Sequence, residues 1–205
     1  TRIYEWNSGT STWTQMGQDI DGEAAFDYFG AEGALSLSSD GSRVAIGAYQ
    51  NDGNGSNSGH TRIYEWNSGT STWTQMGQDI DGEAANDYFG YSVALSGNGT
   101  RVAIGAMFND GGGTSSGHTR IYEWSGSAWF QMGSDIDGRA ADSRSGFSIG
   151  LSSNGTRVVI GAYRDSLAYS RSGLVRVYDW SGSAWIQKGQ DITGPASSSY
   201  AGTGV

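Results

Sequence analysis

The sequence predicts an all-β fold made of one unit repeated along the chain, and three observations support this prediction. The segment TRIYEWNSGTSTWTQMGQDIDGEAA begins at Thr1 and occurs again, identical, at Thr61. Of the 205 residues, 34 are glycine and one is proline, without the Gly-X-Y period of collagen. The 8 tryptophans and 11 tyrosines argue against disorder. Short strands joined by glycine-rich turns account for all three.

The spacing of the repeat identifies its architecture. The tryptophan of the YEW or YDW motif recurs at intervals of 60, 58 and 56 residues, at Trp6, Trp66, Trp124 and Trp180. The differences in length fall in expected turns, where insertions are tolerated. A β-helix has a much shorter period, whereas four antiparallel strands per unit at this spacing are typical of a β-propeller blade. We therefore predict a β-propeller built of four-stranded antiparallel blades.

Within a full unit the strands follow in a fixed order. The first is predicted at Phe89–Ser96, ended by the hairpin signal Gly97-Asn98-Gly99, and the second at Thr100–Ala106. A polar loop leads to the third strand, His118–Trp124, and a short turn leads to the fourth, Trp129–Gly133. Small residues in the first two strands suit the crowded axis of a propeller, and bulky aromatic residues in the last two suit its wide rim.

The predicted blades divide the chain into a single array. They comprise a half blade at 1–29, blades at 30–89, 90–145 and 146–201, and the start of a further blade at 202–205. Such an array cannot close into a ring, because an open sheet edge would remain at each end. We expect either a longer polypeptide or self-association with another copy to complete the ring.

Composition excludes several classes of partner. The net charge is −9, and a negative field repels phosphate backbones and anionic lipids, so we do not expect nucleic acid to bind. No stretch is long and apolar enough for membrane insertion. Cysteine is absent, which rules out disulfides, thiolate metal sites and thiol nucleophiles. Cations, proteins and glycans are the partners that this composition permits.

Two motifs of the repeat resemble bacterial and marine FG-GAP repeats, which are relatives of the repeats of the integrin α-subunit propeller. Phe89-Gly90 matches the FG element, and Gly105-Ala106 matches the start of the GAP element. The resemblance implies an extracellular or cell-surface propeller that binds a protein or a glycan. The FG element is kept in one other unit and altered in two: Phe29-Gly30, Ser145-Gly146 and Ala201-Gly202.

Calcium is a candidate ligand, but at a different place from the family's own site. Integrin-like repeats hold calcium in a D-x-D-x-D-G loop between strands one and two, where this chain has only SSDGS, SGNGT and SSNGT. Acidic residues are densest instead in the D-I-D-G-E motif, whose alternate carboxylates could converge on one ion. The alternative is a solvated turn in which aspartates accept backbone hydrogen bonds. The candidate metal ligands are Asp19, Asp21, Glu23, Asp79, Asp81 and Glu83.

Two further groups of residues are candidate ligand-binding sites. Loops rich in Asn, Asp and Gly could bind a cation or sugar hydroxyls, the alternative being a flexible surface loop. The tryptophans that start the outermost strand are expected to be partly exposed and could stack on sugars, the alternative being packing between blades. The loop candidates are Asp52, Asn54, Asn109 and Asp110, and the tryptophan candidates are Trp73, Trp129 and Trp185.

Repetition favours a scaffold over a single catalytic pocket, because each unit's first task is to pack against the next. The two histidines, His60 and His118, occupy the same position of the repeat, which indicates a paired structural role. Two segments match the G-x-S-x-G motif of serine hydrolases, beginning at Gly113 and Gly146. Neither lies at a strand-to-helix elbow, so neither indicates a catalytic serine. The leading hypothesis is a non-catalytic extracellular scaffold for adhesion, recognition or assembly. A lectin-like glycan-binding module and, further off, a polysaccharide-active enzyme are the alternatives.

Overall fold

The computed structural model describes residues 1–31 and 33–205. Glu32, which falls in the predicted blade at 30–89, lies outside the described residues. The described part of the chain contains no helix, and so none long and apolar enough to cross a membrane. The prediction of an all-β fold is confirmed.

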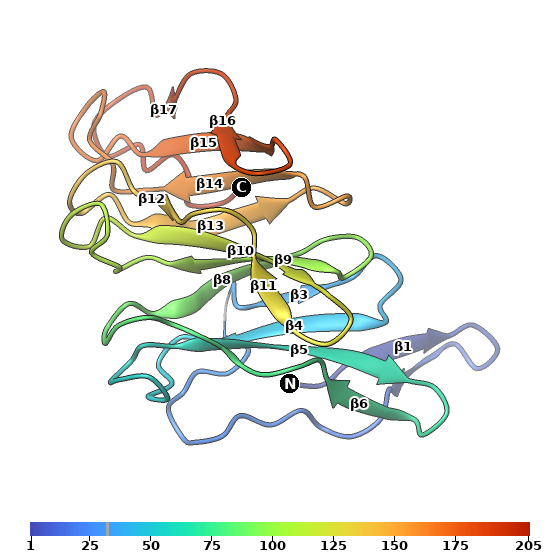
Figure 1. Cartoon of the computed structure of the whole chain (residues 1–205). Coiled ribbons are helices and arrows are strands. Elements are labelled where there is room, and N and C mark those ends of the chain that lie inside the picture. Colours follow the sequence, from blue (N-terminus) through green and yellow to red (C-terminus); the bar gives the residue numbers. More distant parts are fainter. Residues whose placement is uncertain (32) are drawn as a thin grey trace.

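Three successive sheets each contain four antiparallel strands in sequence order (Figure 1). A hairpin, β1 (Tyr4–Asn7) and β2 (Thr12–Gln15), precedes them. The strands of the first sheet are β3 (Leu35–Leu37), β4 (Arg43–Ala48), β5 (His60–Asn67) and β6 (Thr72–Gln75). Those of the second are β8 (Phe89–Leu95), β9 (Arg101–Ala106), β10 (His118–Trp124) and β11 (Trp129–Gln131). Those of the third are β13 (Ser145–Leu151), β14 (Arg157–Ala162), β15 (Leu174–Trp180) and β16 (Trp185–Gln187).

The outer strand of each sheet resumes after a short interruption, which the sequence analysis missed. In the second sheet, β11 pairs with the end of β10 and β12 (Ile136–Asp137) pairs with its beginning, with His118 opposite Asp137. The equivalent short strands are β7 (Ile80–Asp81) and β17 (Ile192–Thr193). The sequence analysis treats the D-I-D-G motif as a metal site or a solvated turn, whereas half of the segment pairs with the third strand.

Neighbouring sheets approach each other most closely at their first two strands. Strand β8 lies against β4 and β3 of the preceding sheet, and β13 lies against β9 and β8 in the same way. Figure 1 shows the three sheets side by side in chain order, with the hairpin that contains β1 at one side of the first. Sheets that meet at their inner strands and follow one another in this order are the blades of a β-propeller.

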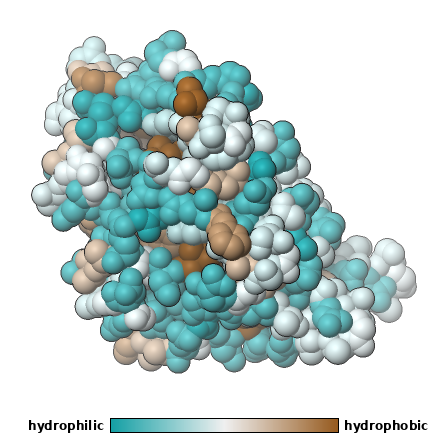
Figure 2. Space-filling model, viewed as in Figure 1, coloured by the Kyte–Doolittle hydropathy of each residue, from teal (hydrophilic) through white to brown (hydrophobic). Residues whose placement is uncertain are grey.

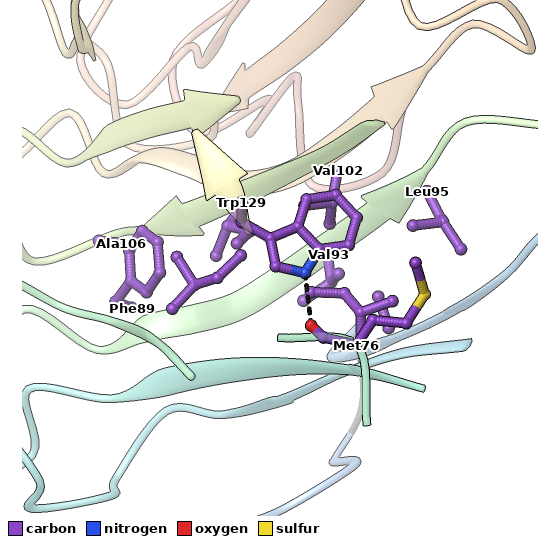
Figure 3. Packing of buried hydrophobic residues seen from close by; sticks show 11 residues of the cluster. Met76, Phe89, Val93, Leu95, Val102, Ala106 and Trp129 are labelled. Atoms are coloured by element: carbon purple, nitrogen blue, oxygen red, sulfur yellow. Dashed lines mark hydrogen bonds between the residues drawn. The ribbon is translucent and has the colours of Figure 1, made fainter. Parts of the chain in front are cut away.

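The hydrophobic core lies between blades. One cluster joins Ala45, Ile63 and Met76 of the first blade to Phe89 and Trp129 of the second, together with other residues of β8 and β9 (Figure 3). A similar cluster lies between the second and third blades. Because neighbours cover a blade on both faces, its strands lack the alternation of apolar and polar residues seen in one-sided sheets.

Glycine pairs set how closely the inner strands approach. A Cβ atom on Gly105 of β9 would lie 2.1 Å from the carbonyl oxygen of Gly146 in β13. Gly146 itself has φ +80° and lies at a β-bulge, where the register of the strand shifts. No side chain fits between these two backbones. The same contact recurs between Gly47 and the Gly90 oxygen at 2.1 Å and between Gly161 and the Gly202 oxygen at 2.2 Å.

We expect Gly105→Ala to destabilise the fold by about 3 kcal/mol or more, because the new methyl group would force two backbones apart. Gly150→Ala is the matched control, since a Cβ atom on Gly150 of β13 would meet nothing nearer than 3.8 Å. That control should cost less than about 1 kcal/mol. Urea unfolding followed by tryptophan fluorescence measures both. Equal midpoints for the two variants would contradict the inter-blade glycine contact.

Candidate functional site

Each unit pairs an arginine of its third strand with the first aspartate of the D-I-D-G motif. Arg120 donates through Nε to Asp135 Oδ1 at 2.9 Å and through Nη2 to Oδ2 at 2.8 Å. Gln131 of the outer strand adds a bond to Oδ1 at 2.7 Å. Asp135 lies in the interruption between β11 and β12, where its carboxylate accepts the hydrogen bonds of Arg120 and Gln131. The other pairs are Arg2 with Asp19, Arg62 with Asp79 and Arg176 with Asp191.

The glutamate of the motif reaches across to the next blade. Glu83 follows β7 of the first blade, yet it accepts hydrogen bonds from Arg120 and, at 2.7 Å, from Asn109 of the second. Asn109 is buried and also donates to Asp87 at 2.8 Å. One blade's glutamate is thus brought to the arginine and aspartate of the blade that follows.

The acidic candidates consequently group across motifs and not within one. Among the described residues, the groups whose ligand atoms lie within 4.8 Å of one another are Glu23 with His60 and Asp79, and Glu83 with His118 and Asp135. Asp19 and Asp21 belong to neither group, and both are exposed in the first connector. Asp81 also belongs to neither group. The sequence analysis proposed Glu23, Asp79 and Glu83 as ligands, but it did not include Asp135 or the two histidines and did not foresee the grouping.

His118 is the most enclosed member of its group. Its side chain is 1% exposed, and Nδ1 lies 3.7 Å from Glu83 Oε1 and 3.6 Å from Asp135 Oδ2. Neither ring nitrogen has a hydrogen-bond partner among the described residues. Burial, reinforced by the charge of Arg120, lowers the pKa of the imidazole to about 4. The ring is therefore neutral at physiological pH.

Burial has the opposite effect on the second aspartate of the motif. Asp81 lies in β7 opposite His60, and burial together with the charge of Asp79 raises its pKa. Burial and the charge of Asp135 raise the pKa of Asp137 in the same way. In these two motifs the first aspartate, beside its arginine, has a lowered pKa and the second a raised one.

The junction between the second and third blades replaces this arrangement. Arg139, after β12 of the second blade, stands at the position of Glu83, and Leu174 of the third blade occupies the position of His118. Arg139 donates to the buried Asp165 at 2.9 Å, and Ser143 donates to the same carboxylate at 2.8 Å. The cross-blade contact is kept, but it now joins an arginine to a carboxylate that stands at the position of Asn109.

The loop candidates mainly organise their own loops. Asp110 Oδ1 accepts a hydrogen bond from the backbone amide of Ser115 at 2.7 Å. Asp52 accepts one at 2.7 Å from the amide five residues later. The Asn54 side chain donates to the carbonyl of Gly82 at 2.8 Å, which ties this loop to the following connector.

The candidate tryptophans pack between blades. Trp129 is 5% exposed, and its indole Nε1 donates to the carbonyl oxygen of Met76 in the preceding blade at 2.8 Å (Figure 3). Trp73 and Trp185 make the same bond to the preceding unit at 2.9 Å. The expectation of partial exposure is wrong for Trp73 and Trp129, whose indoles fill the gap between outer strands. Trp185 is half-buried.

An aromatic band, which the sequence analysis overlooked, follows the inner strands. Tyr91 of β8 contacts Tyr49 and Phe147 with ring centroids 5.2 and 5.3 Å apart. Phe147 in turn contacts Tyr163 at 4.3 Å. Tyr91 and Phe147 also line a depression of about 450 Å³. The available signal was the aromatic residue that directly follows the FG or GA element in most units.

Taken together, the sheets and their junctions define a β-propeller repeat protein. More particularly, residues 80–122 match the FG-GAP repeat family, which confirms the resemblance seen in the sequence. The structure explains that motif physically. Phe89 is fully buried between blades, Gly90 adopts φ +88° at the bulge, and Gly105 admits the neighbouring backbone. The glycine persists where the phenylalanine is lost, because it is the glycine that the backbone contact requires.

Solved structures share this arrangement of sheets. Crystal structures of putative 6-phosphogluconolactonases from Bacteroides fragilis and Bacteroides uniformis align with TM-scores of 0.51 and 0.55, at 10% and 12% identity. The alignments cover 78% and 92% of this chain but only 38% and 50% of those chains. At such identity the similarity shows the fold alone. No curated protein sequence matches the chain.

We expect Trp129→Phe to destabilise the protein by about 2 kcal/mol, because it leaves the buried Met76 carbonyl without its donor and opens a small cavity. Trp13→Phe is the matched control, since Trp13 occupies the same position of the repeat but is 64% exposed. It should change stability by less than about 0.5 kcal/mol. Chemical denaturation measures the stability of both variants. Comparable losses of stability would contradict the inter-blade role of Trp129.

Proposed function

We propose that this chain is a non-catalytic scaffold that assembles through the faces of its blades. The observation that carries the proposal is one contact that joins every pair of neighbouring units. The indoles of Trp73, Trp129 and Trp185 each donate to a carbonyl oxygen of the preceding unit. Trp13 lies on a hairpin of the same sequence and carries the same chemistry on a side chain that is 64% exposed.

The other half of this contact is a backbone carbonyl. Each inter-blade bond ends on the carbonyl of the residue that follows the outer-strand glutamine, as at Met76 and Met132. In the third blade that residue is Lys188. A second copy of the chain could present Trp13 to this carbonyl and continue the interface that already joins the blades.

The most strictly repeated residues have structural roles, which supports a scaffold function. The paired glycines, the tryptophans and the Arg–Asp pairs all hold one blade to another or one strand to the next. On the face shown in Figure 2, hydrophilic residues predominate and hydrophobic ones lie in small separate groups. We place the scaffold at the cell surface or in the extracellular matrix, as the resemblance to integrin α-subunit repeats implies.

Sedimentation of the chain across a range of concentrations tests assembly. We expect reversible self-association, weakened at least tenfold, or about 1.4 kcal/mol, by Trp13→Ala because the central aromatic anchor is removed. Phe130→Ala is the control, since Phe130 is 61% exposed on an outer strand but is not the tryptophan that meets another blade. A strict monomer at every concentration, or equal effects of the two variants, would refute the proposal.

Glycan binding is a second candidate function, favoured by the depression beside the aromatic band. Tyr91 and Phe147 line it together with Ser148 and Thr203, so that aromatic and hydroxyl-bearing residues line one hollow. Sugars bind to such combinations through stacking and hydrogen bonds. In a panel of oligosaccharides, we expect Phe147→Ala to weaken any binding at least tenfold, about 1.4 kcal/mol, and Phe130→Ala to leave it unchanged. The absence of binding across the panel would exclude this candidate.

A further inference from the structure

We propose that Glu83, His118 and Asp135 form a binding site for a divalent transition metal of the Zn²⁺ type, and that Glu23, His60 and Asp79 form a second. Each site joins a connector of one unit to the third strand of the next. The D-I-D-G-E motif thus contributes to metal binding, but with a histidine and across two blades, which the calcium hypothesis did not include.

The hydrogen bonds leave three atoms of the group able to bind an ion. A carboxylate oxygen can accept about two bonds. Asp135 Oδ1 already accepts from Arg120 and Gln131, whereas Oδ2 accepts only from Arg120. Glu83 Oε1 accepts only from Asn109. Asp135 Oδ2, Glu83 Oε1 and the unpartnered Nδ1 of His118 are the atoms that face one another.

The separations of these atoms fit a small metal ion. Nδ1 lies 3.7 Å from Glu83 Oε1 and 3.6 Å from Asp135 Oδ2. Ligands held about 2.1 Å from a tetrahedral Zn²⁺ stand about 3.4 Å apart, so small movements suffice. The two carboxylates and Arg120 sum to a charge of −1, which favours a cation. One imidazole with two carboxylates suits Zn²⁺ or Co²⁺, whereas calcium requires more ligands, all of them oxygen.

A comparison within the chain supports the same conclusion. The glutamate and the histidine occur together at two junctions between units. Both are absent from the junction between the second and third blades, where Arg139 and Leu174 replace them. Asp191 keeps its arginine partner there. The Arg–Asp pair is therefore retained without the other two ligands, which indicates that Glu83 and His118 serve a purpose of their own.

The test is metal titration of the whole chain after treatment with EDTA. We expect two Zn²⁺ ions per chain by calorimetry, a rise in melting temperature of about 5 °C at saturating metal, and a visible absorption band when Co²⁺ is bound. CaCl₂ at the same concentration should leave the melting temperature unchanged. Absence of saturable Zn²⁺ binding, or a Ca²⁺ effect equal to that of Zn²⁺, would overturn the proposal.

Variants assign the ions to the two sites. His118→Leu copies the leucine of the third unit and should reduce the stoichiometry to one, and adding His60→Leu should abolish binding. Glu123→Gln is the control, because it removes a carboxylate from the other end of β10 that pairs with Arg101. Should a leucine variant fail to fold, Glu83→Gln removes a ligand charge with little change of shape and should likewise cost one ion. Binding that survives the double histidine substitution would refute the site.

Discussion

The close approach of glycine backbones at the inner strands is the constraint on which the rest of the structure depends. Gly105 and Gly146 bring β9 and β13 so near that a methyl group on Gly105 would lie 2.1 Å from a carbonyl oxygen. With the inner strands held this close, the bulkier outer strands must diverge, which makes each sheet a wedge. The small residues near the axis and the tryptophans at the rim are two consequences of one geometry.

The outer contacts then hold the wedges at a fixed angle. Trp129 fills the space that opens between outer strands and bonds to the carbonyl of Met76. Glu83 crosses the same junction at the other end of the third strand and meets Arg120. Because every blade meets its neighbour through equivalent contacts, the same sequence can serve at successive positions. This explains why the segment at Thr1 and its copy at Thr61 remain compatible with one fold.

The fold was predictable because its determinants are local. The Asn98-Gly99 turn and the change from small to aromatic residues located all four strands of the second blade, and the structure has them at nearly the same bounds. The candidate site was predictable only in part, since exposure depends on neighbours. Trp13 and Trp73 stand in identical sequence, yet one is 64% exposed and the other 4%.

The sequence by itself determined the all-β repeat, the order of strands in a blade and the residue types at each position, because turns and periodicity act over a few residues. Only the tertiary structure decided which copies of a motif lie in contact with one another. Glu83 and Asp135 belong to successive motifs, and they come together because the blades pack side by side with a connector crossing between them. The burial of His118 beside those carboxylates arises in the same way. Burial results from the packing of blades against one another, so no single segment of the sequence determines it.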